Sequence, residues 1–302
     1  MGGPPVTVVV PHHGSPGTPV PLLDALLGQV EAPPLEVVLV DDASTERFPD
    51  RDGVTVVRRK TNGGFGSAVN TGVAAARGAD ADLLLVLNSD LVIGEGFVRD
   101  LVVAAEPWMP AVVSPRVVGT DGTEAAIGRR FPRVRHQVVE WLVPLARWRG
   151  LDALHRAVGH EVTAPGLTAP VDWVVGAALL LPLGEFRAVG GFDPRFFMNS
   201  EEVDLQRRLR ERGLPSVVLD QPTATHEGGG SSDPALRRRW LVESRLAYAD
   251  KWGGRRRLQA GLAAATAVNL VWNTGRRVAG RRVAPLATAR EELSMITRRS
   301  AS

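Results

Sequence analysis

An acidic cluster in the second half of the chain has the residue types and spacing of a site for proton transfer. The segment Glu201-Glu202-Val203-Asp204 places three carboxylates within four residues, shortly after a Gly190-Gly191-Phe192-Asp193 turn. Neighbouring carboxylates repel one another, which raises one pKa towards the range that suits a general base. Acidic residues also favour a helix start for structural reasons, because they complement the helix dipole. We interpret the cluster as part of an active site.

Two further groups of polar side chains follow apolar runs. Asp41-Asp42 comes directly after the run 35–40, and Asn88-Ser89-Asp90 follows the run 82–87. Carboxylates of the first group could accept hydrogen bonds from a base edge or from ribose hydroxyls, and they could equally cap a helix. Asp90 could hold Mg²⁺ or Mn²⁺ together with diphosphate oxygens, although an aspartate at a strand end is by itself more often a cap.

Two glycine-rich segments could bring the backbone close to a ligand. The segment 62–72 opens a helix, whose N-terminus favours phosphate. It lacks the G-x-G-x-x-G spacing and follows the third expected strand, so it is not a dinucleotide fingerprint, and a structural turn is the alternative. The second segment follows His226, which could ligate a metal, touch a diphosphate or simply be solvated.

The regions between these groups have the periodicities of an α/β fold. The expected strands are 6–10, 35–40, 54–58, 82–87, 111–118, 171–181 and 217–219, and the expected helices are 22–29, 63–76, 97–105 and 201–212. Their alternation predicts a doubly wound, mostly parallel sheet with helices on both faces. Ligands bind such sheets at the carboxyl ends of the strands, so His12-His13, Asp41-Asp42 and Ser89-Asp90 indicate a single crevice.

Charge is distributed unevenly along the 302 residues. Residues 1–232, which we assign to the α/β domain with an irregular helical insertion at 129–170, carry a net charge of −7. Residues 233–302, which we expect to form a basic helical region, carry +10. The basic region indicates an anionic partner. We expect an anionic membrane surface rather than nucleic acid, because no nucleic-acid recognition motif accompanies the arginines; a solvated tail is the alternative.

Composition excludes several classes of protein and location. The chain has no cysteine, which rules out disulfides, thiolate nucleophiles, zinc fingers and iron–sulfur clusters. The apolar stretch 258–272 is shorter than the roughly 20 residues of a spanning helix. The first residues lack the basic and apolar regions of a secretory signal. We therefore expect a cytoplasmic protein, attached peripherally to the inner face of the cell membrane.

The motifs in this order and spacing resemble the family 2 inverting glycosyltransferases with a GT-A fold, and most closely their rhamnosyltransferase-like branch, which acts on polyprenyl-diphosphate sugars. The likeness runs from about Val6 to Ser232. It implies a donor site made of Pro11, Asp41, Asp42, Asn62, Gly63, Phe65, Asn70, Ser89 and Asp90. It also implies an acceptor side with Trp173, Gly176 and Asp204, a metal site with Asp90 and His226, and catalysis by Glu201 and Glu202.

The resemblance implies that a sugar, rhamnose in that branch, moves from a nucleoside-diphosphate donor to a hydroxyl of a lipid-linked or glycan acceptor in cell-envelope polysaccharide synthesis. Glu202 matches the general base, and Mg²⁺ or Mn²⁺ offsets charge on the diphosphate. Two positions depart from the family pattern. Asn88 stands at the first position of the metal-binding DxD motif, and Glu202 is one methylene longer than the usual aspartate.

Three other functions fit part of the pattern. A glycoside hydrolase also uses two carboxylates, but it needs neither the glycine-rich segment nor a metal site. A sugar nucleotidyltransferase should carry a basic, glycine-rich loop after the first strand, where this chain has Pro11-His12-His13-Gly14-Ser15. A non-catalytic scaffold that binds nucleotide sugars, suggested by Asn88 and Glu202, is separated from an enzyme by a measurement of transfer.

Overall fold

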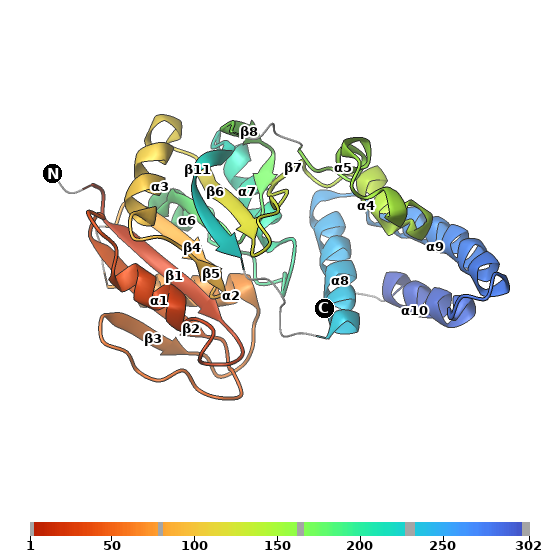
Figure 1. The fold of residues 1–302 in the computed structure, drawn as a ribbon, viewed down its shortest axis with the longest axis horizontal. Helices are drawn as coiled ribbons and strands as arrows, with labels where there is room; N and C mark the ends of the chain where they lie inside the picture. The colour runs from red at the N-terminus through yellow and green to blue at the C-terminus, as the bar shows by residue number, and fades with distance from the viewer. Residues whose placement is uncertain (1–2, 78–80, 162–165, 227–232, 298–302) are drawn as a thin grey trace. The chain divides into compact units, whose positions relative to one another are not determined.

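The computed structural model describes residues 3–77, 81–161, 166–226 and 233–297. Internal contacts divide the chain into two units (Figure 1). The first unit comprises Met1–Arg129 and Thr163–Ser231, and the second comprises Arg130–Val162 and Ser232–Ser302. Residues 130–162, which are most of the insertion expected at 129–170 in the α/β domain, are thus grouped with the C-terminal helices.

The first unit is built on a mixed sheet with the strand order β3-β2-β1-β4-β10-β6-β11-β5, and β8 pairs with β11. These strands are β1 (Val6–His12), β2 (Leu35–Asp41), β3 (Val54–Arg58), β4 (Leu83–Leu87), β5 (Leu91–Val92), β6 (Val112–Gly119), β8 (Ala169–Val171), β10 (Ala178–Pro182) and β11 (Ser216–His226). Strands β1 to β4 are parallel, whereas β10 runs antiparallel to both β4 and β6. A separate two-stranded sheet joins β7 (Gly128–Arg129) and β9 (Trp173–Val174).

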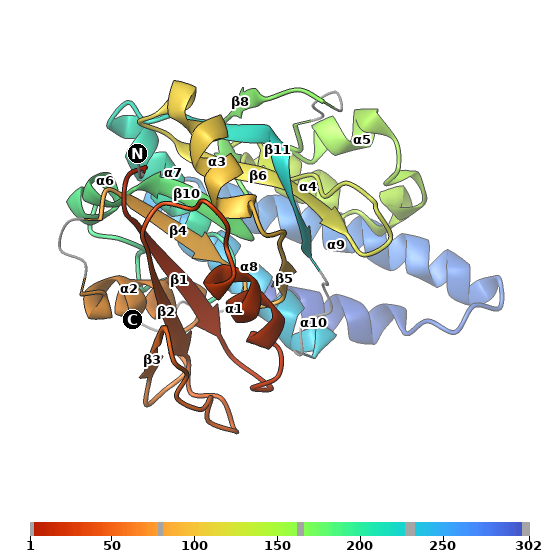
Figure 2. The same cartoon turned by 60° about the vertical axis from the view of Figure 1, so that its left-hand side comes forward.

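Helices cover both faces of this sheet (Figures 1 and 2). Successive side chains of a strand point to opposite faces of the sheet. Because helices cover both faces, both sets of β1 side chains are buried. Val8 and Val10 pack with α1 (Val20–Leu27) and α3 (Phe97–Ala105). Val9 packs with the other layer, which contains α2 (Phe65–Ala75), α6 (Leu183–Ala188) and α7 (Glu201–Glu211). Burial on both sides explains why these strands read as continuous apolar runs.

The predicted α/β architecture is confirmed, with two local differences. The segment 171–181, expected as one strand, contributes to β8, β9 and β10, and the chain turns around Gly176 between the last two. The strand expected at 217–219 is the beginning of the longer β11, whose pairing with β6 continues beyond an irregularity between Val218 and Thr223. The apolar run 171–181 gives no sign of where the chain turns. The later part of β11 is more polar, so the sequence does not mark it as a strand, and its pairing with β6 is visible only in the structure.

The second unit is helical. It contains α4 (Val134–Trp141), the 3₁₀ helix η2 (Val143–Trp148), α5 (Asp152–Ala157), α8 (Pro234–Trp252), α9 (Arg255–Val278) and α10 (Pro285–Thr297). Trp141 donates its indole N–H to Thr266 Oγ1 at 2.9 Å, and Asn269 Nδ2 donates to the Trp141 carbonyl at 2.9 Å. These bonds join the insertion to α9, beside an apolar cluster that includes Leu258 and Leu262. No helix within the described ranges is both long and apolar enough to cross a bilayer.

Candidate active site

Asp41, at the end of β2, orders the loop that follows it. Its side chain is fully buried and accepts hydrogen bonds from the backbone N–H groups of Ser44 (2.8 Å) and Phe48 (3.1 Å) and from Arg58. Burial by itself would raise the pKa of Asp41, but these hydrogen bonds outweigh it, and the pKa is lowered. The carboxylate is enclosed by protein donors, so its geometry fits a role in positioning the loop, and the direct donor contact expected from the sequence stays a prediction.

Asp42 holds the glycine-rich segment in place. Its carboxylate accepts from the backbone N–H of Gly63 (3.1 Å) and Gly64 (2.9 Å) and from Arg59 (2.7 Å). Gly64 has φ 82°, and a Cβ there would lie 1.7 Å from the Phe197 carbonyl oxygen, so only glycine fits. Asn62, another expected donor residue, accepts from the Gly64 N–H at 3.0 Å. Asp42 and Asn62 thus shape the segment before α2 through its backbone.

Residues from β1, from the turn between β4 and β5, and from β11 meet where the metal site was expected. His226 Nε2 lies 3.0 Å from Asp90 Oδ1 and 3.5 Å from Asn88 Nδ2, and Ser89 Oγ lies 3.2 Å from His12 Nδ1. The hydrogen bond to Asp90 raises the pKa of His226. Burial opposes ionisation of Asp90, but its contacts with His226 prevail and lower its pKa. Pro11 is buried in β1 beside this group, opposite Val40.

The donor set of this group fits a divalent cation in part. A carboxylate and an imidazole, both partly exposed, are suitable ligands for Mn²⁺ and, through the carboxylate, for Mg²⁺. No group of three or more His, Cys, Asp or Glu side chains gathers within the described ranges, so a cation here would need further ligands from a diphosphate and water. The segment 227–232 after His226 lies outside the described residues.

Glu201 and Glu202 lie at the first turn of α7, with raised pKa values. Burial, then the charge of Glu202, raises the pKa of Glu201 well above its ordinary value. Burial also raises the pKa of Glu202, and the charge of Arg129 opposes that shift. The Oε2 atom of each glutamate is buried and accepts no hydrogen bond from the described residues. Glu202 retains partial exposure, whereas Glu201 is 4% exposed, so Glu202 is the better placed to meet a substrate.

Residues expected on the donor and acceptor sides meet at Glu202. A Cβ added to Gly176 would lie 3.5 Å from Glu202 Cβ and 3.7 Å from Phe65 Cε1, so all three residues are neighbours. Trp173, on β9, is partly exposed and pairs with Arg129 of β7. Asn199 and Ser200, just before α7, have φ values of 68° and 67°. Such strained backbone in residues other than glycine is typical of functional sites.

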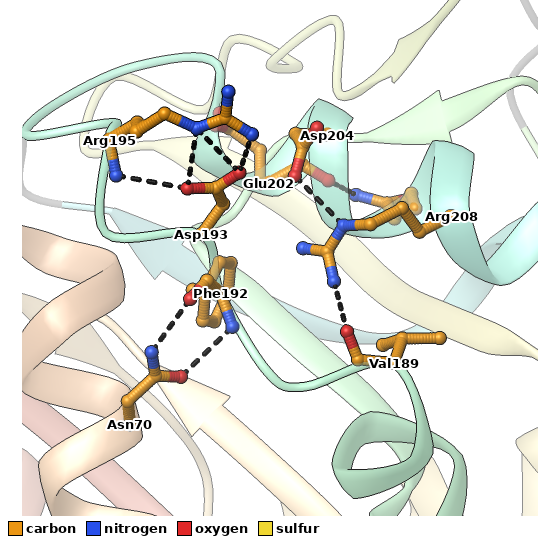
Figure 3. Close-up of polar contacts among 9 residues, drawn as sticks. Asn70, Val189, Phe192, Asp193, Arg195, Glu202, Asp204 and Arg208 are labelled. Atoms are coloured by element: carbon orange, nitrogen blue, oxygen red, sulfur yellow. Dashed lines mark hydrogen bonds and ion pairs between the residues drawn. The ribbon is translucent and has the colours of Figure 1, made fainter. Parts of the chain in front are cut away.

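Asn70 and Asp204 brace the turn before α7 (Figure 3). Asn70 Nδ2 donates to the Phe192 carbonyl at 2.8 Å, and the Phe192 N–H donates to Asn70 Oδ1 at 2.9 Å. Asp204 is fully buried and pairs with Arg208 (2.9 Å), which also donates to the Val189 carbonyl at 2.7 Å. Both side chains therefore hold this part of the chain in place, and the expectation that Asn70 binds donor and Asp204 binds acceptor stays a prediction.

Two residues at the site were not predicted from the sequence. Arg129 supplies the positive charge that acts on Glu202 from the neighbouring two-stranded sheet. Gln206, fully buried in α7, accepts from the Val174 N–H (2.8 Å) and donates to the Val174 and Glu202 carbonyls. It fastens β9, the strand of Trp173, to the helix of Glu202. Arg129 lies far in sequence from Glu202, as does Gln206 from Val174, and no local pattern marks either contact.

Comparison of the sequence with known proteins identifies glycosyltransferases as relatives of this chain. The model of glycosyl transferase family 2 matches residues 7–143. The N-acetylglucosaminyl-diphospho-decaprenol L-rhamnosyltransferase of Mycobacterium tuberculosis (strain CDC 1551 / Oshkosh) is 30% identical over 250 residues, covering 76% of this chain and 79% of that protein. The O-antigen biosynthesis protein RfbC of Myxococcus xanthus is 29% identical over 243 residues, which are 76% of this chain and 18% of that protein.

The solved structures confirm the GT-A type of fold. GalNAc-T7, crystallised with UDP, GalNAc and Mn²⁺, superposes with a TM-score of 0.57 at 14% identity, over 81% of this chain and 47% of that one. This chain therefore spans about half of that protein's length. A structural neighbour that holds a nucleoside diphosphate and a divalent cation is consistent with use of a divalent metal among such enzymes. On its match to the family model and its likeness to the rhamnosyltransferase, the chain belongs to glycosyl transferase family 2 and is a glycosyltransferase.

Proposed function

We propose that the chain transfers a sugar, with inversion of the anomeric configuration, from a nucleoside-diphosphate donor to an acceptor hydroxyl, and that Glu202 is the general base. The observation that carries this proposal is the arrangement around Glu202. Its carboxylate has an unpaired buried oxygen and a raised pKa, and it lies beside Gly176 and Phe65. A base with these properties is suited to receive a proton near neutral pH.

In this reaction the acceptor hydroxyl gives its proton to Glu202 as its oxygen attacks the anomeric carbon. The bond to the diphosphate breaks in the same displacement, so the configuration inverts and no covalent enzyme intermediate forms. Glu201 remains protonated beside Glu202, because burial and the charge of its neighbour raise its pKa well above the ordinary value. A neutral Glu201 avoids repulsion with the ionised base.

Asp90 and His226 would hold a divalent cation at the diphosphate. When bound, Mg²⁺ or Mn²⁺ offsets the negative charge that develops on the leaving group. Ser89 and the backbone of the segment held by Asp42 lie near the ends of the parallel strands and would contact the donor. The remaining positive charge for the phosphates would come from Arg59, which pairs with Asp42.

The relative's printed name supports a choice of substrates. It is an N-acetylglucosaminyl-diphospho-decaprenol L-rhamnosyltransferase, so we propose an L-rhamnosyl nucleotide as donor and a lipid-diphosphate-linked sugar as acceptor, in the synthesis of a cell-envelope glycan. A lipid-linked acceptor lies at a membrane surface, which the second unit could contact. Val268, Val271 and Val278 of α9 are 51%, 75% and 86% exposed, near Arg276 and Arg277. Leu258 and Leu262, earlier in the same helix, are buried in the core and are not available to lipid.

Transfer by the purified full-length chain tests the proposal. The protein is incubated with dTDP-L-rhamnose, Mg²⁺ and a short-chain prenyl-diphosphate N-acetylglucosamine, and the product is identified by mass spectrometry and its anomeric configuration by NMR. Glu202→Gln should lower kcat by about 10²–10⁴-fold and leave nucleotide binding unchanged, because the amide keeps the size but cannot accept the proton. Glu211→Gln, at the exposed far end of α7, is the matched control.

Three results would contradict parts of the proposal. A Glu202→Gln variant with normal turnover beside an inactive Glu201→Gln variant would move the base to Glu201. A product with retained configuration would exclude the single displacement. Donor binding without any transfer by the wild-type chain would favour the non-catalytic scaffold.

A further inference from the structure

A cavity of about 500 Å³ lies in the second unit and is lined by residues of α4, η2, α5 and α8. This volume is in the range of pockets that take small organic ligands. Its apolar walls include Trp141, Leu142, Leu145, Leu154, Val158 and Leu241. A pocket that opens to solvent and is lined mostly by apolar side chains, with a few polar groups, has the character of a ligand-binding site.

Charged side chains also line this cavity, and most of them are balanced. Arg245 pairs with Glu140 inside the lining. Arg238 pairs with Glu292 and lies over the Trp141 ring, with its guanidinium carbon 4.7 Å from the centroid. Arg149 is different: it lines the cavity and is exposed, and it has no carboxylate partner in the described part of the chain. One cation is therefore available to a ligand.

Two histidines complete the polar part of the lining. His155 Nδ1 and His160 Nδ1 are 2.8 Å apart, which is hydrogen-bond distance, so one of these nitrogens carries the shared proton. The lining thus combines apolar side chains with the Arg149 guanidinium, which has no carboxylate partner among the described residues, and with two imidazole groups.

We propose that this cavity binds the diphosphate end of an isoprenoid lipid, with Arg149 at the diphosphate and the first isoprene units against the apolar walls. The inference rests on the proposed function, because such a lipid would be the carrier of the acceptor sugar. The lining selects this class of ligand over simpler ones. A free anion would leave the apolar walls uncovered, and a neutral lipid would make no charge-assisted contact with Arg149. The volume holds a few isoprene units and not a whole lipid chain.

Binding of farnesyl diphosphate to the full-length chain, measured by calorimetry without divalent cation, tests the inference. Farnesyl diphosphate should bind at least about 10-fold more tightly than inorganic diphosphate, because burial of isoprene units adds to the contact with Arg149. Arg149→Ala should weaken that binding about 10-fold, as expected for loss of a charge-assisted contact. Arg156→Ala is the matched control: it removes the same charge from an exposed position on α5 that does not line the cavity.

A second variant tests the apolar part of the site. Val158→Trp would occupy part of the cavity, and it should reduce the affinity for farnesyl diphosphate towards that for inorganic diphosphate. Its melting temperature is compared with that of the wild type, and the inference does not depend on this variant alone, because Arg149 is exposed and its replacement disturbs no packing.

The outcomes separate this inference from the proposed function. Equal weakening by Arg149→Ala and Arg156→Ala, or equal affinity for farnesyl diphosphate and inorganic diphosphate, would overturn the cavity as a lipid site. Sugar transfer to the short-chain prenyl-diphosphate N-acetylglucosamine is measured in parallel on the wild-type chain. Arg149-dependent binding without any transfer would refute the proposed function and leave the cavity as a site for isoprenoid diphosphates. Transfer without such binding would refute the cavity alone.

Discussion

Replacement of Asn70 by alanine should destabilise the first unit, because one side chain satisfies two backbone groups of the turn before α7. Asn70 donates to the Phe192 carbonyl at 2.8 Å and accepts from the Phe192 N–H at 2.9 Å. Each buried polar group left without a partner costs about 1–3 kcal/mol. Water can reach part of this site, since Asn70 is only partly buried, so we expect a loss of about 2–4 kcal/mol in the free energy of unfolding.

The assay is thermal and urea unfolding, followed by transferase activity at a temperature where the variant is folded. The melting temperature should fall by about 4–10 °C. The turn also precedes the strained residues Asn199 and Ser200 and the helix of Glu202, the proposed base, so kcat should fall as well. Thr71→Ala is the control, because the Thr71 hydroxyl bonds only to the Ser67 carbonyl within α2. Unfolding of Asn70→Ala within about 1 °C of Thr71→Ala would refute the reasoning.

Three more predictions concern the metal, the acidic pair and the second unit. Chelation by EDTA, or Asp90→Ala, should abolish transfer and weaken nucleotide binding, and full activity in excess EDTA would remove the cation from the mechanism. Burial raises the pKa of Glu201, so the folded state favours its protonated form. The stability that this group contributes is therefore present at low pH. It declines as the pH rises from the ordinary pKa of a glutamate towards the raised pKa of the folded state. Glu201→Gln should therefore raise the melting temperature at pH 8 and leave it unchanged at pH 4; equal melting of variant and wild type at pH 8 would contradict the raised pKa. In liposome co-sedimentation, binding should increase with anionic lipid, decrease with salt, and fall in Val271→Asp with Arg276→Glu, whereas Arg187→Glu, an exposed change on α6, should have no effect. Equal sedimentation of both variants would exclude α9 as the membrane contact.

The predicted bounds of strands and helices were most accurate where apolar residues recur with the period of the element. The expected helix at 97–105 coincides with α3, and the strands 35–40 and 54–58 match β2 and β3 to within a residue. The apolar side chains of α3 pack on the sheet, and β2 and β3 are runs rich in apolar side chains within it. The ends of these apolar patterns therefore indicate where the elements begin and end. The segment 171–181 was predicted less well, because its division into β9 and β10 depends on a turn at Gly176, which packs near Glu202, 26 residues further along the chain.

In the candidate site, the sequence indicates the types of residue that come together but not the role of each one. The sequence indicated which polar groups follow the strands, and the structure brings Asp90 together with His226, and Glu202 together with Gly176 and Phe65. The sequence could not indicate that the side chains of Asp41 and Asn70 form hydrogen bonds with backbone groups of neighbouring loops. An aspartate or asparagine at such a position has the same pattern whether it binds a ligand or a loop. Only the positions of the neighbouring N–H groups distinguish the two roles.

The sequence by itself determined the α/β alternation, the ends of the parallel strands as the place of the site, and the acidic pair at the start of a helix. These properties are local, because each depends on residue type and spacing within one or two elements. The tertiary structure alone decided that residues 130–162 pack with the C-terminal helices, that a cavity lies in that second unit, and that Arg129 acts on Glu202. Each of these depends on contacts between residues that are distant in sequence, and periodicity carries no record of such contacts.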